Sequence, residues 1–163
     1  MEVSKIFERY KVKTENNQIY DPIRMKYVRL TPEEIVRQKT IKFLMKRLGV
    51  PQETIIVERG LSALGVENSK KRIDIGILDE EDLLMGVVEC KAGIINTEAP
   101  YRQAQDYLID LNTRYFFVTD GHVFDGYFWN TSQFIRLDSI PKYEQWYYYP
   151  TESLDKETPR CRF

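Results

Sequence analysis

The clearest periodic pattern lies in LTPEEIVRQKTIKFLMKRLG, residues 30–49, where apolar residues recur at helical spacing. Thr31 suits the N-cap of this helix, Pro32 its first turn and Gly49 its end. A second helical pattern covers residues 98–112. Apolar runs bounded by turn residues predict strands at 54–58, 72–78, 83–91 and 114–121, and in HVFDGYFW and QFIRL. This order predicts an α/β domain with a mixed central sheet flanked by helices.

The ends of the chain are less regular than its middle. Residues 1–30 hold short apolar pieces between turn residues and predict one or two strands. The segment from 144 onward is first aromatic and then polar, which predicts a packing segment followed by a frayed tail at about 150–163. The length of 163 residues suits a single domain, 1–163, with a core at about 18–140.

Charge and composition narrow the function classes. Lys and Arg number 24 against 25 for Asp and Glu, so the net charge of −1 lacks the positive excess of many nucleic-acid-binding domains but leaves room for a local basic patch. Two cysteines are too few for a disulfide framework, and one histidine argues against histidine-rich zinc sites. The sequence shows neither a signal peptide nor an apolar run of about 20 residues, so we expect a cytoplasmic protein with no membrane partner.

Three charged residues interrupt the apolar hairpin RIDIGILDEEDLLMGVVECK, residues 72–91: Asp74, Glu89 and Lys91. Side chains alternate along a strand, so Glu89 and Lys91 share a face. A turn at 79–82 would place Asp74 opposite Val87 and diagonal to Glu89, roughly 7–8 Å away. A pairing shifted by two residues would place Asp74 directly opposite Glu89. Both registers put the two carboxylates on one face.

Two converging carboxylates repel each other unless a positive group lies between them. Mg²⁺ accepts one or two carboxylates together with waters and substrate phosphates. With Lys91 to orient a water and balance charge, the set suits metal-assisted hydrolysis of a phosphodiester. The alternative is a solvated sheet face that carries a Glu–Lys pair. The apolar letters before Glu89 predict a strand covered on both faces, where an unpaired carboxylate is costly.

Glu34 is a third candidate carboxylate. Thr31 and Glu34 form a capping-box pattern, so Glu34 can bond back to the cap amide. Helical spacing also puts Glu34 and Gln38 on the core-facing side, where Glu34 can reach the sheet. Capping alone and capping combined with a site role both remain open. Glu58 ends a strand and is a candidate for a further acidic contribution, although solvation at the edge of the sheet is the favoured interpretation.

Five segments carry a resemblance to a known family: YDPIRMKYVRLTPEEIVRQ, KRIDIGILD, VVECKAG, QAQDY and FFVTDG. Together, over about residues 18–125, they resemble the N-terminal nuclease domain of type I restriction enzyme R subunits, and more narrowly its stand-alone bacterial forms. That domain belongs to the PD-(D/E)XK nuclease superfamily. The resemblance implies a restriction-endonuclease-like core and a Mg²⁺-dependent endodeoxyribonuclease of restriction-modification systems, in which Mn²⁺ can substitute.

The resemblance also assigns roles to residues. It implies a catalytic trio of Asp74, Glu89 and Lys91, with Asp74, Glu89 and Glu34 around the metal. It implies that the motif Gln103-x-x-x-Tyr107 supports the site and the DNA backbone, although Tyr107 also fits an apolar packing stripe. The sequence departs from the family pattern at three positions outside the trio: Ile73, Gly93 and Asp120.

Basic residues near the hairpin are candidates for DNA contacts. Lys70, Lys71 and Arg72 precede the strand of Asp74, and Arg37 could extend the patch from the helix; the alternative is an ordinary basic surface loop. The chain has no Gly-rich Lys-Ser/Thr loop, so we expect no ATP-driven motor.

Three functional hypotheses remain open. The first is a nuclease that acts on DNA alone, as a homodimer, or with other restriction-system subunits. The second is a catalytically weak or inactive nuclease-fold module for DNA binding or interaction. The third is a structural role in which the aromatic segment QWYYYP, residues 145–150, forms a contact surface.

Overall fold

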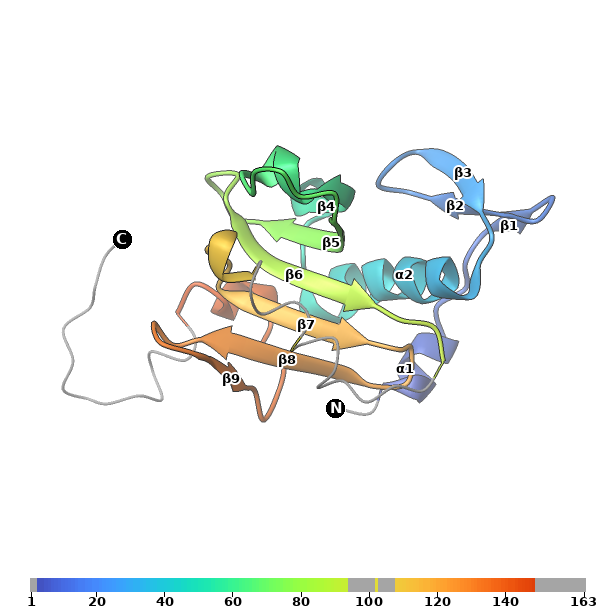
Figure 1. Ribbon diagram of the computed structural model, residues 1–163. Coiled ribbons are helices and arrows are strands. Elements are labelled where there is room, and N and C mark those ends of the chain that lie inside the picture. The colour runs from blue at the N-terminus through green and yellow to red at the C-terminus, as the bar shows by residue number, and fades with distance from the viewer. Residues whose placement is uncertain (1–2, 94–101, 103–107, 149–163) are drawn as a thin grey trace.

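The computed structural model describes residues 3–93, 102 and 108–148, and within them the chain forms an α/β fold with two sheets (Figure 1). The larger sheet has six strands in the order β4-β5-β6-β7-β8-β9, with β6 and β7 parallel and the other neighbours antiparallel. Its strands are β4 Ile55–Gly60, β5 Arg72–Leu78, β6 Leu84–Cys90, β7 Tyr115–Thr119, β8 Phe124–Trp129 and β9 Phe134–Arg136. The expected mixed central sheet is therefore present.

The smaller sheet and the helices complete the fold. The smaller sheet is antiparallel, in the order β1-β2-β3, with β1 Thr14–Glu15, β2 Gln18–Asp21 and β3 Lys26–Arg29. The helices are α1 Ser4–Glu8, α2 Pro32–Phe43 and its π-helical continuation η1 Leu44–Leu48, and the 3-10 turns η2 Gln52–Thr54, η3 Leu61–Leu64 and η4 Tyr143–Gln145. The prediction of one or two strands before residue 30 therefore missed α1 and one strand.

Helix α2 has the ends that the sequence predicts. The hydroxyl of Thr31 accepts a hydrogen bond from the amide of Glu34 at 3.1 Å, and Pro32 opens the helix. Gly49 ends η1 at φ 81°, a left-handed conformation that glycine adopts at low cost. The helix packs on β5 and β6 and buries Ile41 there (Figure 1). This packing brings Arg37, in the second turn of α2, to Asp74 of β5.

The β5–β6 hairpin has a register two residues away from the one that a short turn predicts. Ile75 pairs with Val88 and Gly76 with Val87, so the register places Asp74 across from Glu89. The prediction that Asp74 opposes Val87 was therefore wrong, and the shifted alternative is the one observed. The difference arises because the turn is longer than expected and because the ladder contains a bulge between Ile77 and Leu78.

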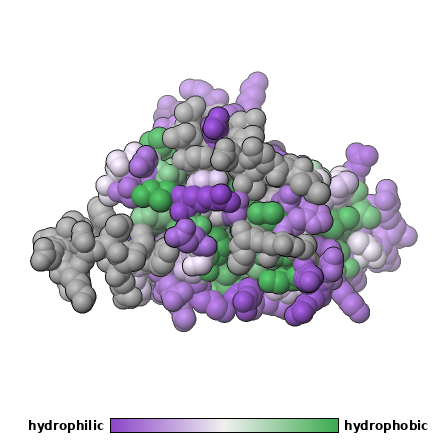
Figure 2. Space-filling model, turned by 90° about the horizontal axis from the view of Figure 1, so that it is seen from below, coloured by the Kyte–Doolittle hydropathy of each residue, from purple (hydrophilic) through white to green (hydrophobic). Residues whose placement is uncertain are grey.

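Aromatic side chains fill much of the core between the sheet and the C-terminal segment. Trp146 is fully buried, with its ring centroid 5.1 Å from that of Tyr115 and 5.0 Å from that of Phe117. The segment around Trp146 is thus a packing segment, as predicted, while the predicted frayed tail lies outside the described residues. Seen from below, the surface mixes hydrophilic residues with smaller hydrophobic patches (Figure 2).

The predicted helix at 98–112 falls mostly on residues that the structure does not describe. Within the described part, residues 108–110 are helical. In the described ranges, no helix is both long enough and apolar enough to cross a membrane.

Candidate active site

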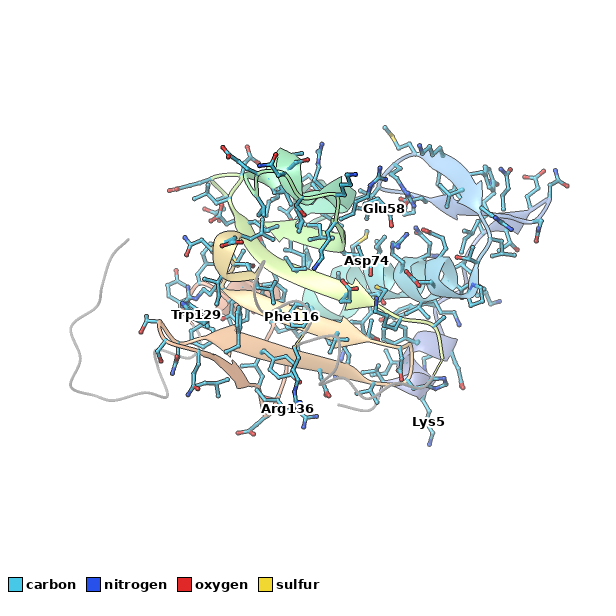
Figure 3. The ribbon with its side chains drawn as sticks, in the orientation of Figure 1. Lys5, Glu58, Asp74, Phe116, Trp129 and Arg136 are labelled. Atoms are coloured by element: carbon cyan, nitrogen blue, oxygen red, sulfur yellow. The ribbon has the colours of Figure 1, made fainter. Side chains whose placement is uncertain are left out.

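Three carboxylates occupy matching positions on three neighbouring strands. On β4 and β5, the pairs Val57–Ile75 and Arg59–Ile73 flank Glu58 and Asp74, and on the next strand the register puts Glu89 across from Asp74. We call Glu58, Asp74 and Glu89 the acidic row. Figure 3 labels the first two, with Asp74 next to α2 and Glu58 above it. Glu58 has a φ of 51°, unusual for a non-glycine residue, which points to local strain at this position.

Arg37 reaches into this row from α2. Its Nη2 lies 2.7 Å from Asp74 Oδ1 and 2.6 Å from Glu58 Oε1, and its Nη1 donates to Glu34 Oε2. The side chain is only 6% exposed. Burial alone would lower the pKa of Arg37, but the charges of Asp74 and Glu34 outweigh it and raise that pKa. Arg37 therefore supplies the positive charge next to Glu34, Glu58 and Asp74, whereas the cation in contact with Glu89 is Lys91.

Glu34 combines a backbone role at the cap with a side-chain role in the site. While its amide bonds to Thr31, its carboxylate points inward and Oε1 accepts from Gln38 Nε2 at 2.9 Å and from Arg24 Nη2 at 3.0 Å. Arg24 also binds Asp21 Oδ2 at 2.6 Å. The Glu34 carboxylate thus contacts Arg24, Arg37 and Gln38 rather than the cap amide that the capping-box pattern predicts, and its role in the site stays a prediction.

Asp74 links two strands and the helix. Its Oδ2 accepts the backbone amide of Cys90 at 2.7 Å, while its Oδ1 receives Arg37. Each carboxylate oxygen therefore accepts a hydrogen bond, one from a guanidinium and one from a backbone amide, and the residue is 9% exposed. Hydrogen bonds of this kind fix the carboxylate in one orientation.

Glu89 and Lys91 form an ion pair on the same face, with Lys91 Nζ 2.6 Å from Glu89 Oε1. Burial, and then the negative charge of Asp74, raise the pKa of Glu89 despite this pair. Burial would lower the pKa of Lys91, but its hydrogen bond to Glu89 and the nearby carboxylates raise it overall. Lys91 is thus a cation at neutral pH.

Two of the three predicted metal ligands, Asp74 and Glu89, have carboxylates that suit a hard cation such as Mg²⁺. Burial, and then the negative charge of Asp74, raise the pKa of Glu89, so a further cation beside these two carboxylates would favour the ionised form of Glu89. Two carboxylates with water suffice for Mg²⁺. Within the described ranges, no group of three or more His, Cys, Asp or Glu residues is arranged to hold a metal. Because the Glu34 carboxylate is bound to Arg24, Arg37 and Gln38, the fit rests on Asp74 and Glu89.

The other candidate residues divide into three groups. Lys70, Lys71 and Arg72 are exposed, and Arg72 Nη1 lies 3.8 Å from Glu58 Oε2. Arg37 is buried among carboxylates, so its placement gives no support to the predicted DNA contact. Gln103 and Tyr107 lie outside the described residues.

Sequence reasoning missed one member of this network and did not favour the observed contacts of another. Glu58 was expected to be solvated, but its carboxylate binds the buried Arg37. Arg24 was not expected to take part, although it lies in a turn that Asp21 stabilises by accepting two backbone amides. A sequence signal does exist for Arg37, which follows Glu33 and Glu34 at i+4 and i+3 spacing on the helix.

The chain matches a known family over its central region. The family model described as "Type I restriction enzyme R protein N terminus (HSDR_N)" covers residues 32–141. The chain belongs to this family. The matched region contains α2 and the whole acidic row, while β1–β3 precede it. A search of curated proteins finds no match. The resemblance expected from the sequence motifs is thereby confirmed.

Proposed function

We propose that this protein is a metal-dependent DNA endonuclease with a PD-(D/E)XK core, acting in restriction-modification. The observation that carries the proposal is the placement of Asp74 and Glu89 across from each other, with Lys91 in contact with Glu89. The family supports a nuclease-related role. DNA is then the substrate, and the proposal includes the cytoplasmic location that the sequence predicts.

The described residues have distinct parts in this mechanism. Asp74 and Glu89 would hold Mg²⁺ or Mn²⁺, which when bound polarises a phosphoryl oxygen and acidifies a water. Lys91, kept protonated by its neighbours, orients the attacking water and balances the charge that develops on the phosphate. Arg37 fixes the Asp74 carboxylate through Oδ1, and the amide of Cys90 fixes it through Oδ2. Such fixed orientation favours catalysis because the reacting groups need no rearrangement.

One observation favours the second candidate, a nuclease-fold module that binds DNA but cuts it weakly or not at all. Arg37 already neutralises part of the acidic row, which reduces the need for a metal ion. A metal ion at Asp74 must compete with Arg37 for the carboxylate. The two proposals therefore differ in whether a divalent ion binds at Asp74 and Glu89.

A cleavage assay with metal titration separates the two. Supercoiled plasmid is incubated with wild type and with Asp74→Asn, Glu89→Gln and Lys91→Ala, in Mg²⁺, Mn²⁺ or EDTA. Exposed Glu53→Gln and Lys46→Ala are the matched controls. We expect cutting only with metal, loss in the three site variants, and wild-type activity in the controls. DNA binding without cutting in any metal would support the module instead.

Calorimetric titration with Mn²⁺ tests the metal directly. We expect binding to wild type and at least about tenfold weaker binding to Glu89→Gln, because one of two carboxylate ligands is lost. Equal affinity in both proteins would contradict the assignment of Glu89 as a ligand.

A further inference from the structure

The small sheet and the segment that leads into it concentrate positive charge. Residues 9–29 contain six Lys and Arg against two acidic residues, a net charge of +4 in a chain whose total is −1. One of the two acids, Asp21, is buried and paired with Arg24. The cationic side chains that remain at the surface are Arg9, Lys11, Lys13, Lys26 and Arg29. The near-zero net charge of the whole chain conceals this local excess.

The two faces of the small sheet differ in character. Ile19 and Asp21 of β2 are fully buried, which identifies the inner face. On the other face Tyr20 pairs with Tyr27 across the strands, with ring centroids 5.3 Å apart. Tyrosines on this outer face, only partly buried, provide a flat surface beside the cations.

Two cations lie with these tyrosines. Lys13 Nζ lies 5.6 Å from the centroid of Tyr20 and 5.5 Å from that of Tyr27, within range of a cation–π interaction. Arg29 pairs with Gln18, and each lies two residues along its strand from a member of the tyrosine pair. Side chains two residues apart on a strand point the same way, so Arg29 lies on the same face as the tyrosines. Lys13 and Arg29 are both exposed. This face therefore presents ordered positive charge to the solvent.

The small sheet is connected to the acidic site. Its β2–β3 turn carries Arg24, whose guanidinium binds Asp21 at 2.6 Å and Glu34 at 3.0 Å. Glu34 in turn binds Arg37, which holds Asp74. A continuous chain of ion pairs thus fixes the small sheet beside the acidic row, and Figure 1 shows the sheet next to the start of α2.

We propose that the outer face of β1–β3 binds the phosphate backbone of the DNA that the site acts on, with Lys13 and Arg29 as phosphate contacts. The inference rests on the proposed function: if the site acts on DNA, the positively charged face beside it is complementary to the negatively charged phosphates of that substrate. Backbone contacts by Lys and Arg position a nucleic acid without reading its sequence. The small sheet precedes the region that the family model matches, so this surface adds to that domain.

Salt-dependent DNA binding tests this inference apart from cleavage. Fluorescence anisotropy with a labelled 20-base-pair duplex is measured in EDTA over a series of salt concentrations. The test variant is Lys13→Ala/Arg29→Ala. The control Lys5→Ala/Lys46→Ala removes the same charge from exposed sites on α1 and η1; Figure 3 shows Lys5 at the lower edge, whereas β1–β3 lie at the upper edge.

We expect the test variant to bind more weakly and to lower the slope of log K against log salt by about two, one for each lost phosphate contact. The charge-preserving variant Lys13→Arg/Arg29→Lys should restore both affinity and slope, which a folding defect in the alanine variant would not explain. Identical slopes in the test and control variants would overturn the inference.

Three outcomes distinguish this inference from the proposed function. If wild type binds and cuts DNA and the test variant does both equally well, the small sheet is not a DNA surface, while the nuclease proposal stands. If wild type binds with the predicted slope change but never cuts, the surface stands and the nuclease proposal falls. If wild type does not bind duplex DNA at any salt concentration, both are overturned.

Discussion

At the residue scale, Arg37 decides the electrostatics of the acidic row. It contacts Glu34, Glu58 and Asp74 at once and is almost fully buried. We expect Arg37→Met to lower the free energy of unfolding at pH 7 by about 3 kcal/mol, because it leaves buried carboxylates without their cation. Urea denaturation measures this, and exposed Arg59→Met on β4 serves as the control.

Glu89 is expected to behave in the opposite way. Because its pKa is raised in the folded state by burial and by Asp74, its ionised form costs stability at neutral pH. Glu89→Gln should therefore be more stable than wild type at pH 7, and this advantage should disappear below the ordinary pKa of 4.5, where both states of wild type are protonated. Thermal unfolding at several pH values tests this, with exposed Glu53→Gln as the control.

The residues of the site were predictable to different degrees. Strand alternation alone puts Asp74, Glu89 and Lys91 on one face, since the period of two holds in either register. The partner of Asp74 was not predictable, because charge pattern cannot tell whether a metal ion or a distant arginine fills the space. Arg37 could be recognised as a helix residue, but its burial depends on how α2 packs on the sheet.

At the scale of elements, α2 carries its site residues on its first two turns. Glu34, Arg37 and Gln38 all lie within the two turns that follow the Thr31 cap. Thr31→Ala should lower the free energy of unfolding by about 1 kcal/mol, because it removes the acceptor for the Glu34 amide. Chemical denaturation checks this, with exposed Thr14→Ala on β1 as the matched control. Equal stability in wild type and Thr31→Ala would contradict a structural role for this cap.

The predicted elements were mostly correct, and the errors lie where the chain is irregular. The α2 boundaries were predictable because Thr31, Pro32 and Gly49 each suit only a few backbone positions. The β5–β6 register was not, since the bulge near Ile77 adds a residue that no local pattern announces. Helix α1 is a single short turn, and its formation depends on packing rather than on intrinsic propensity.

At the scale of the whole molecule, the N-terminal segment is part of the core rather than an appendage. Phe7 of α1 is buried and stacks on Phe43 of α2 with ring centroids 5.3 Å apart, and the amide of Val3 donates to the carbonyl of His122 at 2.7 Å. The family match nevertheless begins at residue 32. Residues 32–141 alone would therefore expose apolar surface that α1, which precedes the matched region, covers in this chain.

This arrangement predicts that the fragment 32–163 does not fold as the full chain does. We expect it to lose the cooperative urea transition or to unfold at a much lower midpoint, because Phe43 would lose its stacking on Phe7 and Glu34 would lose Arg24. In the full chain, Phe7→Ala should by itself cost about 3 kcal/mol. Exposed Lys5→Ala on the same helix should cost little, and near-UV circular dichroism of both variants distinguishes lost packing from lost secondary structure. A fragment as stable as the full chain would contradict this prediction, because residues 32–163 would then fold without α1 and the small sheet.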